Sequence, residues 1–77
     1  MKTGIEIGNP VSLNKFELIS VRSLVEYAAH SQKASAVIVH EALIDHFGVQ
    51  DITQIPSRSY DDAVRFLVDI KVDMLLN

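Results

Sequence analysis

Apolar residues recur at helical spacing in three stretches of this chain. In the first stretch, residues 15–29, the apolar positions fall three and four residues apart and lie on one side of a helical wheel. They are Leu18, Val21, Leu24, Val25, Ala28 and Ala29. Asn14 precedes the stretch and Glu17 stands three positions later, a spacing typical of a capping box. The pattern predicts a helix whose solvated side carries Lys15, Arg22 and Glu26.

A second helix is predicted over residues 36–47. Its apolar positions recur at three- and four-residue steps and include Ala36, Val39, Leu43 and Phe47. Ser35 suits the N-cap, and Gly48 stands where a left-handed residue commonly ends a helix. The first four residues, 36–39, are rich in β-branched side chains, so a strand over 36–39 is the alternative.

The third predicted helix begins after Ser59, which we expect to cap it. Asp61 and Asp62 fall in its first turn, where the helix dipole favours negative charge. Pro56 keeps Ile55 extended and so separates this helix from the preceding loop. The inner apolar stripe, which we expect to hold the core, consists of Ala63, Phe66, Leu67, Ile70 and Met74.

A second apolar stripe lies beside the first on this helix and consists of Val64, Val68 and Leu75. Together the two stripes cover about half of the helix circumference, which is wide for a helix that faces one small core. The surplus apolar surface indicates self-association or docking to a partner. The alternative is that the other two helices wrap round it. We predict a partner interface that consists of Val64, Val68, Leu75, Arg65 and Lys71.

The three stretches predict a mostly α fold, a small three-helix domain over residues 12–77. An ordered loop anchored by Ile52 and Ile55 would join the last two helices. Residues 1–11 form a separate short N-terminal arm that could pair as a strand, since its isoleucines alternate with polar neighbours. A chain of 77 residues has room for one domain of this kind.

Charge and composition narrow the classes of function. The net charge is −3, and the seven Lys and Arg residues are scattered rather than gathered in one stripe. DNA binding depends on cations that neutralise phosphate, so nucleic acid is a possible but not a favoured partner. The chain contains no cysteine, which excludes a disulfide framework and a thiolate metal site.

Hydropathy does not indicate a membrane segment. No apolar run approaches the roughly 20 residues that a membrane-spanning helix needs. Glu6 interrupts the stretch in which a secretory signal would be apolar. We therefore expect a cytoplasmic protein that does not associate with a membrane.

Candidate catalytic and metal-binding residues do not form a recognisable motif. His40 and His46 stand six positions apart, whereas a zincin helix needs histidines four apart on one face. Two pairs of carboxylates have four-residue spacing, Glu41 with Asp45 and Asp69 with Asp73. Paired carboxylates need an enclosing cleft to act as acid and base, so we expect these to be solvated. We expect His40 to pack in the core or at an interface, and we predict no enzyme activity, cofactor or metal.

A series of structural positions follows the second predicted helix, namely Phe47-Gly48-Val49, Ile52, Ile55-Pro56, Tyr60-Asp61, Ala63 and Phe66-Leu67. In this series, over residues 33–67, the chain resembles the ORF6C domain of many phage and prophage antirepressor-type regulators. Members have a helix ending in Phe-Gly-Val, a short loop, Ile-Pro, and a helix that opens with an aromatic–acidic pair. The resemblance implies a role in interaction or assembly within phage gene control. Members are commonly basic before Ile-Pro, whereas this chain is acidic there, with Glu41, Asp45 and Asp51.

Together these patterns predict a non-enzymatic protein-interaction or oligomerisation module of phage or prophage type, linked to transcriptional regulation. Two other classes stay open. One is a small dimeric DNA-binding regulator, whose phosphate contacts would be either Lys15 and Arg22 or Arg58 and Arg65. The other is an acidic phage-encoded inhibitor of a host protein, whose contacts would be Asp61, Asp62, Asp69 and Asp73.

Overall fold

Three α-helices make up most of the described chain. The computed structural model describes residues 11–72. Its helices are α1 (Lys15–Ser31), α2 (Ala36–Phe47) and α3 (Tyr60–Asp69). Two short 3-10 turns lie between α2 and α3, namely η1 (Ile52–Gln54) and η2 (Ser57–Ser59). The prediction of a mostly α, three-helix fold is confirmed.

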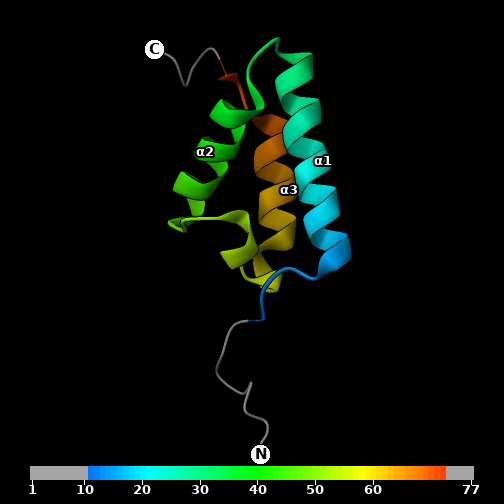
Figure 1. Ribbon diagram of the computed structural model, residues 1–77, viewed down its shortest axis with the longest axis vertical. Coiled ribbons are helices and arrows are strands. Elements are labelled where there is room, and N and C mark those ends of the chain that lie inside the picture. The colour runs from blue at the N-terminus through cyan, green and yellow to red at the C-terminus, as the bar shows by residue number, and fades with distance from the viewer. Residues whose placement is uncertain (1–10, 73–77) are drawn as a thin grey trace, which may run out of the picture.

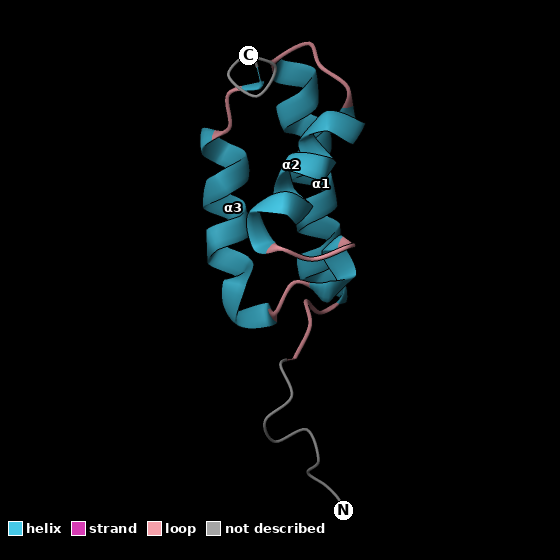
Figure 2. Ribbon diagram, turned by 90° about the vertical axis from the view of Figure 1, so that its left-hand side faces the viewer, coloured by secondary structure: helices cyan, strands magenta, loops and turns pink. Residues whose placement is uncertain are grey.

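The helices pack with their axes roughly aligned. Figure 1 shows α1 and α3 running in the same direction and α2 running opposite to both. Figure 2 shows only helices and loops in this part of the chain. Helix α1 contacts both other helices extensively, while α2 and α3 contact each other less. This difference leaves room for a groove between α2 and α3.

The capping box predicted for α1 is present. The backbone N–H of Asn14 donates to Glu17 Oε1 at 2.9 Å, and the Glu17 N–H donates to Asn14 Oδ1 at 2.8 Å. These bonds satisfy donors that have no helical partner in the first turn. The residues of α1 that are buried in the core are Val21, Val25, Ala28 and Ala29. The helix runs two residues beyond its predicted end, to Ser31.

The second helix has the predicted bounds, so the strand alternative for 36–39 is wrong. Ser35 Oγ accepts a hydrogen bond from the Val37 N–H at 3.1 Å, and Gly48 adopts a left-handed φ of 67° after the last turn. Val39 and Leu43, four positions apart, are both buried in the core. Their spacing matches a helix and not a strand, and their burial outweighs the β propensity of the run.

Helix α3 differs from its prediction at both ends. Ser59 occupies the N-cap position, but its side chain makes no capping hydrogen bond, so the predicted cap is wrong. The chain enters α3 through η2 instead, where the Ser59 N–H donates to the Pro56 carbonyl at 2.9 Å. At its other end α3 stops at Asp69, and Ile70 is extended with φ −64° and ψ 140°. The predicted continuation of the helix through residue 70 is therefore also wrong.

A long-range contact accounts for the conformation after α3. The Gln32 side chain donates from Nε2 to the Ile70 carbonyl and accepts from the Val72 N–H at 2.6 Å. These bonds hold the extended chain at 70–72 against the end of α1. The helical periodicity of the sequence cannot indicate this contact, because the bonded residues are 38 and 40 positions apart.

Buried isoleucines order the loop between α2 and α3. Ile52 and Ile55 are both buried, as expected of loop anchors, and Ile55 is extended before Pro56 as predicted. The Leu13 N–H donates to the Ile55 carbonyl at 3.1 Å, so the chain before α1 runs antiparallel to the chain after Ile55. The loop is therefore held both by its own buried isoleucines and by the chain that precedes α1.

The start of α1 is also joined to this loop. Ser57 Oγ donates to Glu17 Oε1 at 2.9 Å, the same carboxylate oxygen that accepts the Asn14 N–H. One side chain thus serves both the capping box and a contact 40 positions away.

The core of the described chain contains no buried polar side chain. It consists of Leu13, Val21, Val25, Ala28, Ala29, Val39, Leu43, Ile52, Ile55, Ala63, Leu67, Ile70 and Val72. His40 is only partly buried and does not belong to the core, so of its two predicted positions only an interface remains a prediction. Phe66 is also only partly buried, because α2 does not close over it.

Some predictions lie outside the described residues. These concern the strand-like pairing within the arm 1–11, of which only residue 11 is described, and the positions of Met74 and Leu75.

Candidate interaction site

The predicted interface residues lie on two sides of α3 rather than on one. Val68 is 67% exposed and lines a groove toward α1, and Val64, one turn before it on the same face, is half-buried. Arg65 and Lys71 line a second groove, toward α2. Leu75 lies outside the described residues. The structure thus separates the apolar part of the predicted interface from its charged part.

The groove between α1 and α3 is uncharged. It has a volume of about 250 Å³ and is lined by Leu24, Tyr27, Ala28, Ser31, Gln32, Leu67 and Val68. Ala28 and Leu67 are buried, whereas Tyr27 from α1 is 68% exposed and Val68 from α3 is almost equally so. The groove therefore has an apolar wall from each helix.

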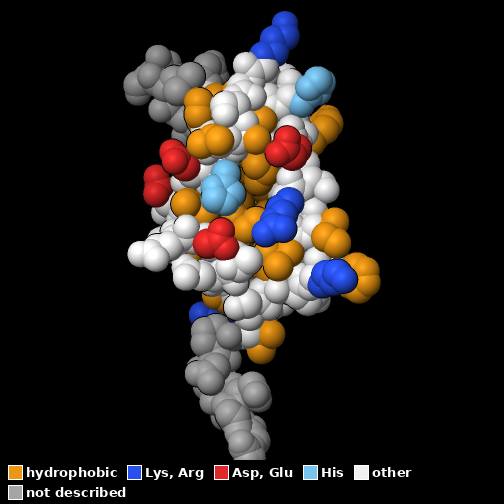
Figure 3. Space-filling view, in the orientation of Figure 1, with side chains coloured by type: hydrophobic (Ala, Val, Ile, Leu, Met, Phe, Trp, Pro, Cys, Tyr) orange, Lys and Arg blue, Asp and Glu red, His pale blue; other side chains and the backbone are white. Residues whose placement is uncertain are grey.

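Two further exposed apolar side chains lie on the outer side of α1, two to three turns before Tyr27. Phe16 is 79% exposed and Ile19 is 53% exposed. Apolar side chains follow the right-hand edge of the molecule in Figure 3, over α1. We call the set Phe16, Ile19, Leu24, Tyr27 and Val68 the α1/α3 surface.

Sequence reasoning missed most of the α1/α3 surface. It treated the side of α1 that lies away from the buried stripe as a charged, solvated face. The signal was present, since Phe16, Ile19 and Tyr27 fall opposite the buried Val21 and Val25 on a helical wheel. This signal was overlooked because the wide apolar stripe that faces the core already accounted for the prediction of a helix.

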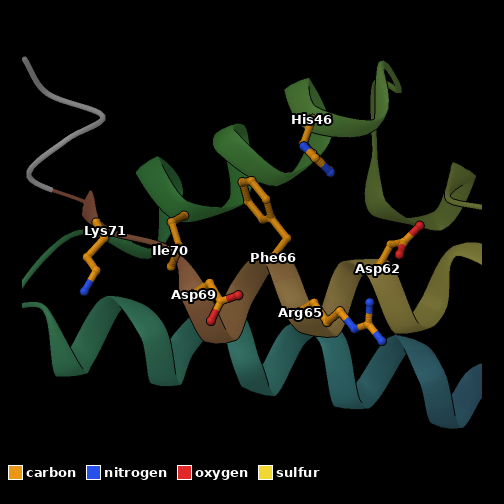
Figure 4. A pocket seen from close by; sticks show the side chains of 7 residues that line it. All are labelled: His46, Asp62, Arg65, Phe66, Asp69, Ile70 and Lys71. Carbon is orange, nitrogen blue, oxygen red and sulfur yellow. The ribbon is translucent and has the colours of Figure 1, made fainter.

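A larger groove opens on the other side of α3, toward α2, and Figure 4 shows it from close by. This α2/α3 groove has a volume of about 520 Å³ and is lined by His46, Asp62, Arg65, Phe66, Asp69, Ile70 and Lys71. The imidazole of His46 stacks on the Phe66 ring, with 4.5 Å between ring centroids and 26° between planes. The Phe47 ring meets the same imidazole edge-on at 4.8 Å. Aromatic rings from α2 and α3 therefore form the middle of the groove.

The charged residues of the α2/α3 groove alternate in sign along the chain. Asp62 and Asp69 are acidic, Arg65 and Lys71 are basic, and all four are exposed. Figure 3 shows acidic and basic side chains next to each other on this face of the molecule. The groove is therefore neither a uniformly basic nor a uniformly acidic surface.

The other candidate contacts are dispersed. Lys15 and Arg22 are exposed on α1, while Arg58 lies in η2 and Arg65 on α3. The acids Asp61 and Asp62 are exposed at the start of α3, and Asp69 is exposed at its end, with the cation Arg65 between them. Asp73 lies outside the described residues. Glu41 and Asp45 are exposed on α2.

The chemistry available in the α2/α3 groove is stacking, ion pairing and apolar contact. Among residues 11–72, no three histidine, cysteine or acidic side chains gather to hold a metal ion. Neither His40 nor His46 stands in such a cluster. The groove is thus suited to binding the side chains of another molecule.

Hydrogen bonds perturb one carboxylate outside both grooves. The Asp51 carboxylate accepts from the Thr53 hydroxyl and from the Thr53 N–H, the latter at 3.2 Å, and so caps η1. These bonds, with the hydroxyl contributing most, lower the pKa of Asp51 below its ordinary value. The folded chain therefore favours the ionised form of the Asp51 carboxyl group.

No protein-family model, curated protein or solved structure matches the chain. In the part of the chain that the structure describes, no helix combines the length and the apolar content needed to cross a bilayer. Function must therefore be inferred from the surfaces of α3 and its neighbours.

Proposed function

We propose that the chain is a non-enzymatic protein-interaction module whose α1/α3 surface binds an apolar segment of a partner protein. The observation that carries the proposal is the exposure of Val68 and Tyr27 on two different helices, at the two sides of one groove. Exposed apolar side chains that adjoin each other favour association, because covering them releases about 25 cal/mol per Å² of apolar area.

The lining of the groove indicates the chemistry of the partner. None of the seven lining side chains is charged, and Ser31 and Gln32 are confined to one end of α1. A charged group docked among Leu24, Leu67 and Val68 would lose its hydration without gaining a partner. The contacting part of the partner is therefore apolar, such as one side of an amphipathic helix.

The size of the surface fits a protein contact. A standard interface buries about 800 Å² on each side. The groove alone is smaller than this, but Phe16 and Ile19 add exposed apolar area two to three turns earlier on α1. A helix lying along α1 and α3 would cover the groove and this added area together.

The sequence resemblance supports a place for this module in phage or prophage gene control, in the cytoplasm. The residues that carry the resemblance serve as a helix end and as loop anchors here, for instance Gly48, Ile52 and Ile55. These three residues support the ends and the connection of α2 and α3, while Phe66 and Leu67 from the same series line the two grooves. The proposed partner is a transcriptional regulator that offers an apolar segment.

The experiment compares Val68→Asp with Val37→Asp as a matched control. Val37 is a valine of α2 with 62% exposure, close to that of Val68, and it lies outside both grooves. In a second experiment, a photo-crosslinking amino acid replaces residue 68 or residue 37. Each protein is mixed with a lysate of the host cell and irradiated, and the captured proteins are identified by mass spectrometry.

We expect a protein that is captured from position 68 and not from position 37. Its binding, measured separately with the purified proteins, should be weakened by Val68→Asp and kept by Val37→Asp. Binding of the purified protein should weaken by at least about tenfold, because the new carboxylate is desolvated in the contact. Equal binding of the captured protein by a folded Val68→Asp variant would contradict the proposal. Circular dichroism of both variants establishes that they are folded.

A further inference from the structure

The α2/α3 groove carries a charge pattern that complements itself. Along the groove the order is Asp62, Arg65, Asp69 and Lys71, which alternates negative and positive. We propose that a second copy of this chain docks on this groove, with its α3 antiparallel to the first. The proposal uses a groove whose lining residues differ from those of the α1/α3 groove, and it does not depend on the proposed function.

A two-fold axis brings opposite charges together. In such an interface, if one residue meets a second residue of the other copy, the second residue also meets the first. With the axis near position 67 of α3, Arg65 faces Asp69 of the second copy and Asp69 faces its Arg65. Asp62 and Lys71 face each other in the same way, since the extended chain after α3 carries Lys71 further along. All four positions thus gain an opposite charge.

The middle of the groove supplies apolar contact between these pairs. Phe66 and Ile70 lie between the charged positions in the sequence, and both line the groove with His46. Phe66 is only partly buried within one copy, and the 520 Å³ of open volume adjoins its ring. Figure 4 shows Phe66 and Ile70 between α2 and α3, with Asp69 and Arg65 beside them on α3. A second α3 laid across the groove would cover the rings of Phe66 and His46 and leave the ion pairs at the edges of the contact.

The pattern favours a second copy over other occupants. The groove has two anions and two cations, so a nucleic acid or a strongly acidic protein would meet Asp62 and Asp69 as well as the cations. A second copy is matched at every charged position. Exposed ion pairs stabilise an interface only weakly, so the charges set the register while the apolar middle provides most of the affinity.

The same charges can also pair within one helix. Arg65 and Asp69 are four positions apart, a spacing at which opposite charges attract within a helix. A test must therefore separate pairing between copies from pairing within one copy. Single charge reversals and their mixture do this.

The experiment measures association of the whole chain by sedimentation equilibrium for Arg65→Asp, for Asp69→Arg and for a one-to-one mixture of the two. A homodimer of Arg65→Asp places two acids opposite each other twice, and a homodimer of Asp69→Arg does the same with two bases. In the mixed dimer both pairs are opposite in sign. Matched controls are Arg22→Asp on α1 and Glu41→Arg on α2, which change net charge equally and lie outside the groove.

We expect each groove variant to raise the dimer dissociation constant by about tenfold or more, and the mixture to return it to within about threefold of the unmodified chain. The controls should change it by less than about threefold. Failure of the mixture to recover would overturn the proposal, because pairing within one helix predicts that result. An unmodified chain that stays monomeric at about 1 mM would also overturn it.

Discussion

The side of α3 that faces α1 and the side that faces α2 carry different chemistry. Toward α1 the surface is apolar and uncharged, and buried side chains from both helices close the groove to about 250 Å³. Toward α2 the groove is about twice as large, contains the stacked rings of His46 and Phe66, and is bordered by four charges. A charged border restricts which partner and which register fit, whereas an uncharged groove accepts many apolar segments.

The difference follows from how closely each neighbouring helix packs on α3. Small side chains such as Ala28 and Ala29 let α1 pack closely against the other helices. On the other side, α2 contacts α3 less closely, and the stacked rings of His46 and Phe66 lie between the two helices. The two sides can therefore be tested separately, because the two grooves share no lining residue.

The largest effect is expected from a buried core residue of α3. Leu67 is buried in the core beneath α3, and Leu67→Ala should lower the free energy of unfolding by about 2–5 kcal/mol through the lost packing and the cavity it leaves. Urea denaturation followed by circular dichroism measures this. The neighbouring Val68→Ala should stay within about 0.5 kcal/mol, because Val68 is mostly exposed. Similar losses for the two variants would mean that Val68 belongs to the core.

An intermediate effect is expected from Gln32, whose side chain holds the chain after α3. Gln32→Ala removes two hydrogen bonds to residues 70–72 and should lower the free energy of unfolding by about 1–3 kcal/mol. Because Ile70 and Lys71 line the α2/α3 groove, self-association should weaken as well.

Hydrogen exchange locates the effect of Gln32→Ala. The Val72 amide, which donates to Gln32 in the folded chain, should exchange faster, while the amides in the middle of α1 keep the protection set by global unfolding. Gln32→Met, which keeps the length of the side chain without its amide, should behave like Gln32→Ala. Unchanged exchange at Val72 would show that other contacts hold this segment.

The smallest effect is expected on the pH dependence of stability, through Asp51 in the loop between α2 and α3. The lowered pKa of Asp51 in the folded chain means that its charge stabilises the fold above the unfolded pKa of about 4. This stabilisation is lost as the pH falls through the lower, folded pKa, since the unfolded chain then binds the proton more readily. Asp51→Asn should reduce the loss of stability between about pH 5 and pH 3, as measured by urea denaturation at each pH. A variant with the same pH profile as the unmodified chain would refute the role of Asp51.

Local sequence signals predicted α1 and α2 closely. The capping box of Asn14 and Glu17, the Ser35 cap and the left-handed Gly48 all act within four residues of a helix end. The buried positions of both helices also follow from spacing alone. Such signals can be identified from the sequence alone, because the interacting groups lie within one helical turn of each other.

The α3 region and the candidate surfaces were predicted less well. The continuous apolar pattern after Asp69 predicted more helix, yet residues 70–72 are held by Gln32. The predicted interface joined Val68 to Arg65 and Lys71, although α1 and α2 place these residues in separate grooves. Phe16 and Tyr27 were not predicted as a contact surface, although they lie opposite the buried stripe of α1, because the buried stripe already accounted for the apolar pattern of that helix.

By itself the sequence determined the number of helices, the start and end of α1 and α2 to within two residues, and the loop anchors Ile52 and Ile55. Only the tertiary structure decided where α3 stops and which of its exposed residues face a common partner. The physical reason is distance along the chain. Caps and stripes depend on neighbours a few positions away, while a groove is made by helices whose packing brings together residues some 40 positions apart.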